Sequence, residues 1–376
     1  MDVDTVVGTG LKITCERDEL VQRVGIVSRA VSTRSAVQVL AGVRLNVEGA
    51  GLEAAATDME MSLRTTVAAD IEGEGSLVVP GKLLADVVRL LPDRDVVIEH
   101  RADEGVVHIS SGTYSSRLNI YGAEDFPRLP AVDVPLHEID RASLLDTVQR
   151  VARSASRDES RPVLTGILVR FEGTTLTMAA TDSYRLSVKE TELSSAGPEL
   201  EAIIPARALA EVARIGADAD TIQLGAHDNY VVFGAGDTWL TSRRIDGQFP
   251  NIKQLLPETF EVEVDLPRGE LLDVVRRAAV LAQRSPLRLA FAEGELTIST
   301  QSQDVGETHE SIPAPYTGAE PLEIGFNAEF LRDGLESFSH DAETVRLKLI
   351  NPLRPGLITT EGDAFWYLIM PIRLAG

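Results

Sequence analysis

The chain has 376 residues, of which 44% are hydrophobic and 25% charged, and its formal net charge at pH 7 is -22. This length exceeds what one hydrophobic core usually supports, so two or three globular domains are expected. No window holds the roughly 20 consecutive apolar residues of a membrane span. The single cysteine, Cys15, excludes an intrachain disulfide and a cysteine-rich metal site, and we expect a cytoplasmic protein.

Residues 1–10 carry neither the basic head nor the apolar stretch of a secretion signal, and we expect them to form a disordered extension. The first predicted element after them is an amphipathic helix whose apolar residues recur at helical spacing from Leu20 to Val31. Two short strands joined by a Glu-Gly turn follow within residues 42–57. A second helix is expected just after Pro80, because proline suits the first turn of a helix.

The same series of landmarks recurs later in the chain, which indicates an internal repeat. The segment LEAAATD at 52–58 is echoed by LTMAATD at 176–182, so the two threonines are 181 - 57 = 124 residues apart. The proline before the second helix recurs at 205 - 80 = 125 residues. In a third, weaker copy, Phe326-Asn327 stands where Ile204-Pro205 stands in the second.

Each repeat is predicted to begin with a helix, to continue with short strands and to contain a second helix. We therefore expect an α+β protein of three repeated domains, each with antiparallel sheets and two helices. The predicted domains are residues 1–133, 134–260 and 261–376. Proline-rich segments at 126–135 and 249–257 are the predicted linkers.

Five of the six main predicted helices carry basic residues at spacings that place them on one face. These residues are Arg23 with Arg29, Lys82 with Arg89, Arg150 with Arg153 and Arg157, Arg207 with Arg214, and Arg277 with Arg284. Asp86 and Glu211 lie inside two of the stripes, so a solvated face with local ion pairs is the alternative for any one helix. The recurrence favours segregated positive charge that attracts phosphates. The sixth helix presents Glu329, Asp333 and Glu336 instead, and the sequence suggests no function for them.

Parts of the sequence are also compatible with a metal-dependent enzyme or with a protein-binding adaptor. Asp58 and Glu60 alternate on a predicted strand and point the same way, as two carboxylates that hold Mg²⁺ in a nuclease would. The matching positions in the second repeat are Asp182 and Tyr184, and the chain has no phosphate-binding glycine loop or nucleophile elbow, so an enzyme is disfavoured. An adaptor with a repeated fold and no DNA role is disfavoured by the arginine faces. We expect no metal and no cofactor.

From about Leu11 to Leu374 the chain resembles the family of bacterial DNA polymerase III β subunits. The resemblance depends on short motifs that occur together in this order: Lys-Ile-Thr at 12–14, Ala-Thr-Asp at 56–58 and 180–182, Arg-Pro-Val-Leu-Thr-Gly at 161–166, Asp-Gly-Gln-Phe-Pro at 246–250, Ile-Gly-Phe-Asn at 324–327 and Met-Pro-Ile-Arg-Leu at 370–374. It implies three domains of one topology and a head-to-tail homodimer, a ring whose helices surround duplex DNA without reading its sequence. It also implies a non-catalytic processivity subunit, found in the cytoplasm with the nucleoid and not on a membrane.

The resemblance assigns three sets of residues. The implied DNA-facing residues are Arg34, Lys82, Arg153, Arg157, Arg207, Arg277 and Arg284. The implied hydrophobic peptide-binding groove, on domain 2 and its junction with domain 3, consists of Leu164, Thr181, Ser183, Tyr184, Arg185, Leu186, Pro250, Leu255, Pro355, Leu368, Met370, Pro371, Ile372 and Arg373. The implied dimer contact joins the strand of Leu118 and Ile120 to the partner's first domain-3 helix near Val280 and Leu281.

The implied partners of the groove are linear peptide motifs. The resemblance assigns these motifs to the replicative DNA polymerase α subunit, the clamp loader, repair polymerases, ligase and mismatch-repair proteins.

Overall fold

The computed structural model describes residues 10–48, 51–101, 104–283, 285–302, 304–318 and 320–374. By its internal contacts the chain divides into two compact units. Unit 1 takes in the chain up to Glu138 together with Glu211–Arg243, and unit 2 takes in Ile139–Ala210 together with the chain from Arg244 onward. The extension expected at 1–10 lies, except for Gly10, outside the described residues.

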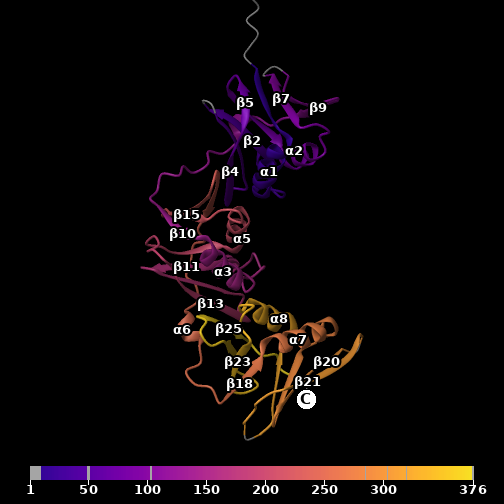
Figure 1. The fold of residues 1–376 in the computed structure, drawn as a ribbon, viewed down its shortest axis with the longest axis vertical. Helices are drawn as coiled ribbons and strands as arrows, with labels where there is room; N and C mark the ends of the chain where they lie inside the picture. The colour runs from indigo at the N-terminus through magenta and orange to yellow at the C-terminus, as the bar shows by residue number, and fades with distance from the viewer. Residues whose placement is uncertain are drawn as a thin grey trace, which may run out of the picture. The chain divides into compact units, whose positions relative to one another are not determined.

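Unit 1 is built on antiparallel sheets covered by two helices that pack against each other (Figure 1). The helices are α1 (Arg17–Val27) and α2 (Gly81–Arg89). A five-stranded sheet has the order β5-β1-β7-β8-β9, and an eight-stranded sheet has the order β10-β15-β16-β17-β4-β3-β2-β6. The strands are β1 (Leu11–Glu16), β2 (Gly42–Glu48), β3 (Gly51–Thr57), β4 (Met61–Val67), β5 (Ala69–Glu72), β6 (Gly75–Pro80), β7 (Asp95–Arg101), β8 (Val106–Ser111), β9 (Tyr114–Asn119), β10 (Leu136–Asp140), β15 (Thr221–Ala226), β16 (Tyr230–Ala235) and β17 (Thr238–Arg243).

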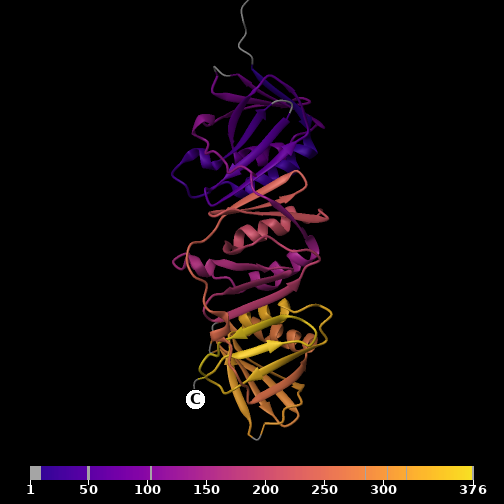
Figure 2. The same ribbon diagram turned by 90° about the vertical axis from the view of Figure 1, so that its left-hand side faces the viewer.

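Unit 2 has a second eight-stranded sheet, in the order β14-β11-β12-β13-β25-β24-β23-β18, and a four-stranded sheet, β21-β20-β19-β22. Figure 2 shows the yellow C-terminal strands side by side as one layer. The strands are β11 (Gly166–Glu172), β12 (Thr175–Thr181), β13 (Arg185–Glu192), β14 (Glu201–Pro205), β18 (Val262–Pro267), β19 (Leu287–Ala292), β20 (Glu295–Ser302), β21 (Gly306–Pro313), β22 (Leu322–Phe326), β23 (Thr344–Leu349), β24 (Gly356–Thr359) and β25 (Phe365–Ile369). The helices are α3 (Arg141–Ala152), α4 (Pro162–Thr165), α6 (Ile252–Leu255), α7 (Arg268–Ala282) and α8 (Ala328–Ser337), and α5 (Ala206–Ile215) crosses the division between the units.

The core of unit 2 follows from the two periodicities of its elements. Helix α7 buries Leu271, Val275 and Ala278 on one face, at the helical spacing that the sequence predicts. Strand β23 buries every second residue, beginning with Val345, because alternate side chains point to opposite faces of a sheet. Both sets join the same hydrophobic cluster. No helix in the described part of the chain combines the length and the apolar composition of a membrane span.

The two Ala-Thr-Asp motifs build the same turn twice. Thr57 ends β3, and its Oγ1 donates to the Met61 carbonyl at 3.0 Å. Thr181 ends β12, and its Oγ1 donates to the Arg185 carbonyl at 2.6 Å. The repeat of the sequence is therefore also a repeat of individual hydrogen bonds.

The aspartate of each motif is part of the turn. Asp58 Oδ1 accepts from the amides of Glu60 and Met61 at 3.1 and 2.8 Å, and Asp182 makes the equivalent pair of bonds at 2.9 and 3.0 Å. The expectation that Asp58 and Glu60 alternate on a strand is wrong, because both lie in the turn between β3 and β4. Among the described residues, no three His, Cys, Asp or Glu side chains are grouped as metal ligands would be.

Two expectations about helices need correction. Arg157 does not share a helix face with Arg150, because α3 ends at Ala152 and the Ser156 amide donates to the Leu164 carbonyl at 2.8 Å instead of continuing the helix. The linker predicted at 249–257 contains the short helix α6, which Asn251 caps by accepting from the Lys253 amide.

Candidate functional site

The junction of the second and third repeats is a continuous sheet, because β13 pairs antiparallel with β25. Leu186 lies opposite Leu368, and Val188 lies opposite Trp366. Since alternate residues share one face of a strand, these four side chains lie on the same face of the sheet. They belong to a hydrophobic cluster of the residues Leu168, Ala179, Leu186, Val188, Leu357 and Leu368.

Partly exposed apolar side chains extend this cluster to the surface. Phe249, Ile252, Leu256, Phe260 and Trp366 pack against it. Tyr184, Leu255, Met370 and Ile372 are exposed large hydrophobic residues, with Tyr184 59% and Met370 40% exposed. We call the cluster and these nine residues the β13–β25 apolar surface. It contains Leu186, Leu368, Tyr184, Leu255, Met370 and Ile372 of the predicted groove.

Arg185 is fixed inside the protein rather than presented to solvent. Its Nε donates to Asp182 at 3.0 Å and its Nη1 to Asp333 at 2.7 Å, and the guanidinium lies 4.3 Å from the centre of the Phe330 ring. Only 10% of the side chain is exposed. Burial opposes its charge, but Tyr367 and the two carboxylates raise the pKa of Arg185 above its usual value. This predicted groove residue is therefore a positioning residue, already paired within the chain.

Tyr184 owes its place to that network. Its ring stacks on Phe330, with 6.4 Å between the ring centres and 28° between the planes. Phe330 in turn accepts a bond at its carbonyl from the buried Tyr367 hydroxyl at 2.7 Å. The exposed Tyr184 ring therefore packs on Phe330, a residue of α8 whose backbone is hydrogen-bonded to the protein core.

The turn at Ser183 links the apolar surface to the segment before α4. Ser183 has φ +82, in the left-handed region that favours glycine, and its Oγ accepts from Arg161 Nη1 at 3.0 Å. Arg161 also accepts at its carbonyl from the amide of Leu164, a half-buried member of the predicted groove. Sequence reasoning placed Arg161 in a motif but did not assign it to the site.

The segment after β25 is held by backbone bonds to both the second and the third repeat. The Met370 amide donates to the Tyr184 carbonyl at 2.8 Å, and the Ile372 amide donates to the Gly325 carbonyl at 2.7 Å. A side chain at Gly325 would meet the Ile372 carbonyl at 2.7 Å. The remaining predicted groove residues, Pro250, Pro355 and Pro371, are half-buried, whereas Arg373 is exposed and Thr181 is buried.

The predicted DNA-facing residues within the described part of the chain are exposed, and two of them form ion pairs with glutamates of other elements. Arg34, Lys82, Arg157 and Arg207 are exposed, and Arg284 lies outside the described residues. Arg277 is paired with Glu310 of β21, and Arg153 with Glu336 of α8 at 2.5 Å. Glu336 and Asp333 of α8, for which the sequence suggested no function, are therefore partners of arginines outside that helix.

The predicted dimer residues differ in exposure. Leu118 is only 8% exposed on β9, the edge strand of its sheet, and Ile120 follows the end of that strand. Val280 is 73% exposed on α7, and the neighbouring Leu281 is half-buried. Val280 is thus the member of this set with the most surface left to bury.

Models of one protein family match the three repeats in turn. The N-terminal domain of the DNA polymerase III β subunit matches residues 11–130, its central domain residues 138–251 and its C-terminal domain residues 253–373. The beta sliding clamp of Synechococcus elongatus is 35% identical over 97% of this chain and 100% of its own length.

Solved structures of the same kind match over the same length. The C. crescentus beta sliding clamp with PEG bound to a putative beta-motif tethering region has a TM-score of 0.91 at 28% identity, over 97% of this chain and all of that one. A Pseudomonas aeruginosa sliding clamp bound to griselimycin has a TM-score of 0.86 at 28% identity, with the same coverage.

Proposed function

Because the chain belongs to the family of bacterial DNA polymerase III β subunits, the sliding clamps, we propose that two copies close head to tail into a ring around duplex DNA. Members of this family are processivity factors and not catalytic subunits. The domain boundaries of the proposal are residues 1–133, 134–260 and 261–376. The proposal places the protein in the cytoplasm, where the bacterial chromosome lies.

The main support for a ring is that strands of neighbouring repeats pair within one sheet. Strand β17, which closes the second repeat, pairs with β4 of the first, and β25, which closes the third, pairs with β13 of the second. Each junction gives an eight-stranded sheet. The first repeat is closed by β9 and the third contributes β21, and both are sheet edges in the described residues. By the same rule, β9 of one copy pairs with β21 of the other.

The helices at this third junction carry apolar surface suited to a partner copy. Leu90 is equivalent to Ile215 and His340, at 215 - 90 = 125 and 340 - 215 = 125 residues, and these two residues line cavities at the two junctions within the chain. Leu90 is 81% exposed, and Leu83 on α2 is also exposed. We place them opposite Val280 and Leu281 of the second copy, with Leu118 and Ile120 nearby. Burying such side chains drives association.

The β13–β25 apolar surface is the proposed binding site for linear peptides. It combines adaptable side chains such as Met370 with the supported ring of Tyr184, which suits a partner that inserts aromatic and leucine residues. The griselimycin-bound and PEG-bound relatives support a ligand site on such clamps. The proposed partners are the polymerase α subunit, the clamp loader, repair polymerases, ligase and mismatch-repair proteins.

The proposed DNA contacts are electrostatic and independent of sequence. Arg34, Lys82, Arg153, Arg157, Arg207, Arg277 and Arg284 form this set. Phosphate contacts carry no sequence information, and water-screened contacts break and reform at little cost per step.

Retention on circular DNA tests the proposal. The purified protein is loaded onto a nicked circular plasmid by an ATP-dependent clamp loader, and half of the sample is then linearised. We expect the ring to stay on the circle and to slide off the linear form. Equal retention on both forms would show that the protein binds DNA by adhesion rather than by encircling it.

A further inference from the structure

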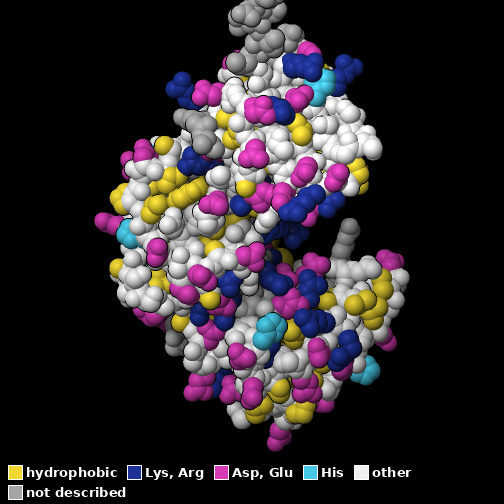
Figure 3. Space-filling model, turned by 45° about the horizontal axis from the view of Figure 1, so that its top comes forward, with side chains coloured by type: hydrophobic (Ala, Val, Ile, Leu, Met, Phe, Trp, Pro, Cys, Tyr) yellow, Lys and Arg dark blue, Asp and Glu magenta, His cyan; other side chains and the backbone are white. Residues whose placement is uncertain are grey.

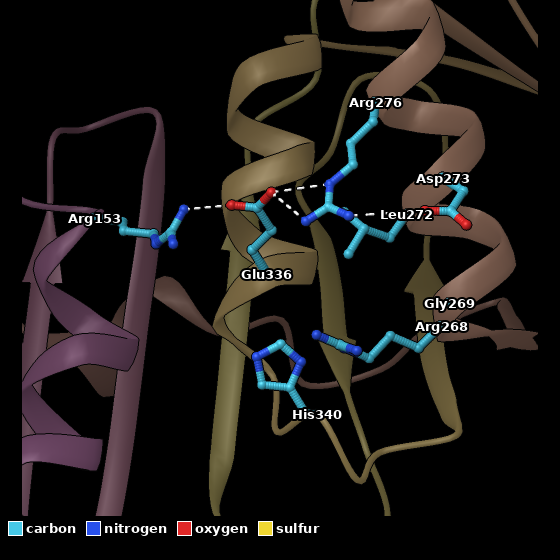
Figure 4. A pocket seen from close by; sticks show the side chains of 8 residues that line it. All are labelled: Arg153, Arg268, Gly269, Leu272, Asp273, Arg276, Glu336 and His340. Carbon is cyan, nitrogen blue, oxygen red and sulfur yellow. Dashed lines mark hydrogen bonds and ion pairs between the residues drawn. The ribbon is translucent and has the colours of Figure 1, made fainter.

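A glutamate lies between two arginines near each of the two repeat junctions within the chain. In unit 2, Glu336 Oε2 accepts from Arg153 Nη1 at 2.5 Å, and Oε1 accepts from Arg276 Nη2 at 2.9 Å (Figure 4). In unit 1, Glu211 lies 3.4 Å from Arg29 Nε and is bonded to Arg214. These contacts join the residue after α3 with α7 and α8 in one unit, and α5 with the segment after α1 in the other.

The two arrangements are copies of one another. The glutamates are 336 - 211 = 125 residues apart, and Arg153 and Arg29 are 153 - 29 = 124 residues apart. These are the spacings of the repeated threonines and prolines. The second arginine differs, since Arg214 comes from the same helix as Glu211 whereas Arg276 comes from α7. A glutamate within ion-pair distance of the arginine that follows the first helix is therefore common to the two repeat junctions within the chain.

Glu336 lies among several basic side chains, with Asp273 as the second acid of the same cavity. A cavity of about 320 Å³ is lined by Arg153, Arg268, Arg276 and His340, with Glu336 between them (Figure 4). Arg268 is only 5% exposed and donates to the carbonyls of Leu335 and Phe338, at the end of α8. Burial lowers the pKa of Arg268, and the nearby Arg276 lowers it further. Three guanidinium groups thus share one small space.

The charge state of Glu336 follows from these neighbours. Burial alone would raise its pKa, but bonds from Arg276 and Arg153 lower the pKa of Glu336 below its usual value. The side chain is therefore an anion at neutral pH, in contact with the groups that a DNA phosphate would seek. Figure 3 shows Lys and Arg side chains adjoining Asp and Glu side chains over the lower part of the molecule.

We propose that Glu336 and Glu211 act as internal substitutes for DNA phosphate, which hold the junction arginines in neutralised pairs and so keep the grip of the ring on DNA weak enough for sliding. The inference rests on the proposed function, because it assumes that these helices face DNA. A phosphate that approaches Arg153 or Arg276 competes with a carboxylate already bonded to the guanidinium. Without the glutamate, among the described residues Arg153 keeps only Asp333 at 3.8 Å and Arg276 keeps only Asp273 at 3.8 Å, so these arginines are less fully neutralised and bind phosphates more strongly, with release of counterions.

Substitution of Glu336 by glutamine tests the inference. Binding of a fluorescent duplex is measured by anisotropy from about 50 to 200 mM salt, and diffusion of loaded rings is followed on stretched DNA. One added phosphate contact steepens the loss of affinity across this range by about threefold. We therefore expect E336Q to bind more tightly at low salt, to lose affinity more steeply with salt and to diffuse more slowly than wild type. E211Q should behave in the same way.

Two control variants distinguish this role from one in which Glu336 only stabilises the fold. E323Q removes the same charge from the Arg288–Glu323 pair, 3.0 Å apart between β19 and β22, and should leave DNA binding unchanged. The double variant R153Q/E336Q should lose most of the gain in affinity. A brace predicts reduced thermal stability in E336Q with no gain in affinity, and that result would overturn the inference. A wild-type ring lost equally from circular and linear DNA would overturn the proposed function instead.

Discussion

Arg185 shows how one side chain can be functional in its effect without meeting a ligand. It holds Asp182, which shapes the Ser183 turn, and Asp333, which belongs to α8. The same guanidinium covers Phe330, on which the exposed Tyr184 ring stacks. The position of the Tyr184 ring therefore depends on a buried charge network.

Replacing Arg185 by methionine keeps much of the volume but removes the cation paired with two nearly buried carboxylates, of which Asp333 keeps Arg332 at 3.3 Å. Breaking a buried pair from one side costs about 3 kcal/mol. We expect the free energy of unfolding to fall by that amount in urea denaturation. The matched variant R346M breaks the Arg346–Asp265 pair, in which both side chains are 45% exposed, and should lose less than about 1 kcal/mol. Equal losses in the two variants would show that the Arg185 network contributes no more than a surface pair.

Asp363 makes stability depend on pH. Lys189 donates to it at 2.5 Å, and Arg150 also pairs with it. Burial opposes the charge, but these cations lower the pKa of Asp363 below the usual 3.8. A carboxyl whose pKa is lower in the folded state stabilises the fold above its unfolded pKa, and this stabilisation is lost as the pH falls through the folded pKa.

The D363N variant should therefore be less stable than wild type at pH 7, and the difference should shrink as the pH falls below about 3.8. Urea denaturation at a series of pH values measures it. D304N, at an exposed turn position, should match wild type throughout. A difference for D363N that stays constant with pH would contradict the assigned role of its charge.

At the scale of elements, periodicity and the repeat predicted several strands and most of the longer helices, because these patterns are local. The strands expected within 42–57 and the helix after Pro80 are confirmed as β2, β3 and α2. The turn at Asp58 was mistaken for strand, because its hydrogen bonds do not appear in an alternating pattern. Arg153 and Arg185 pair with acids of α8 that are more than a hundred residues away in the sequence. The spacing of residues within a helix could not predict such pairs.

The C-terminal segment after β25 is an element without regular structure that the site depends on. Truncation after Ile369 removes Met370, Ile372 and the bond to Gly325, but leaves the pairing of β25 with β13. We expect the truncated protein to remain a folded dimer and to lose affinity for a fluorescent peptide from the polymerase α subunit. A peptide with its apolar anchors changed to alanine gives the background. Unchanged affinity of the truncated protein would exclude this segment from the site.

At the scale of the whole molecule, a ring requires each repeat to pair one edge strand with the preceding repeat and another with the following repeat. Two of these junctions lie within the chain, and they are fixed by β17 with β4 and by β13 with β25. The sequence predicted the threefold repeat but not this pairing, because strands that meet at a junction are far apart along the chain. Strands β9 and β21 are at the edges of their sheets in the described residues. This supports the proposal that they pair between two copies and form the third junction.

An acidic substitution at Val280 tests that junction. V280D places a charge on a side chain that is 73% exposed in the single chain and is proposed to be buried against Leu90 of the second copy. Burying an unpaired charge is strongly unfavourable, so the dimer should dissociate toward a mass of 40.7 kDa in light scattering. The monomer should no longer be retained on circular DNA but should still bind the polymerase peptide, because the β13–β25 apolar surface lies within one chain. M59D, an exposed apolar position in the β3–β4 turn, should remain dimeric, and a dimeric V280D protein would place the interface elsewhere.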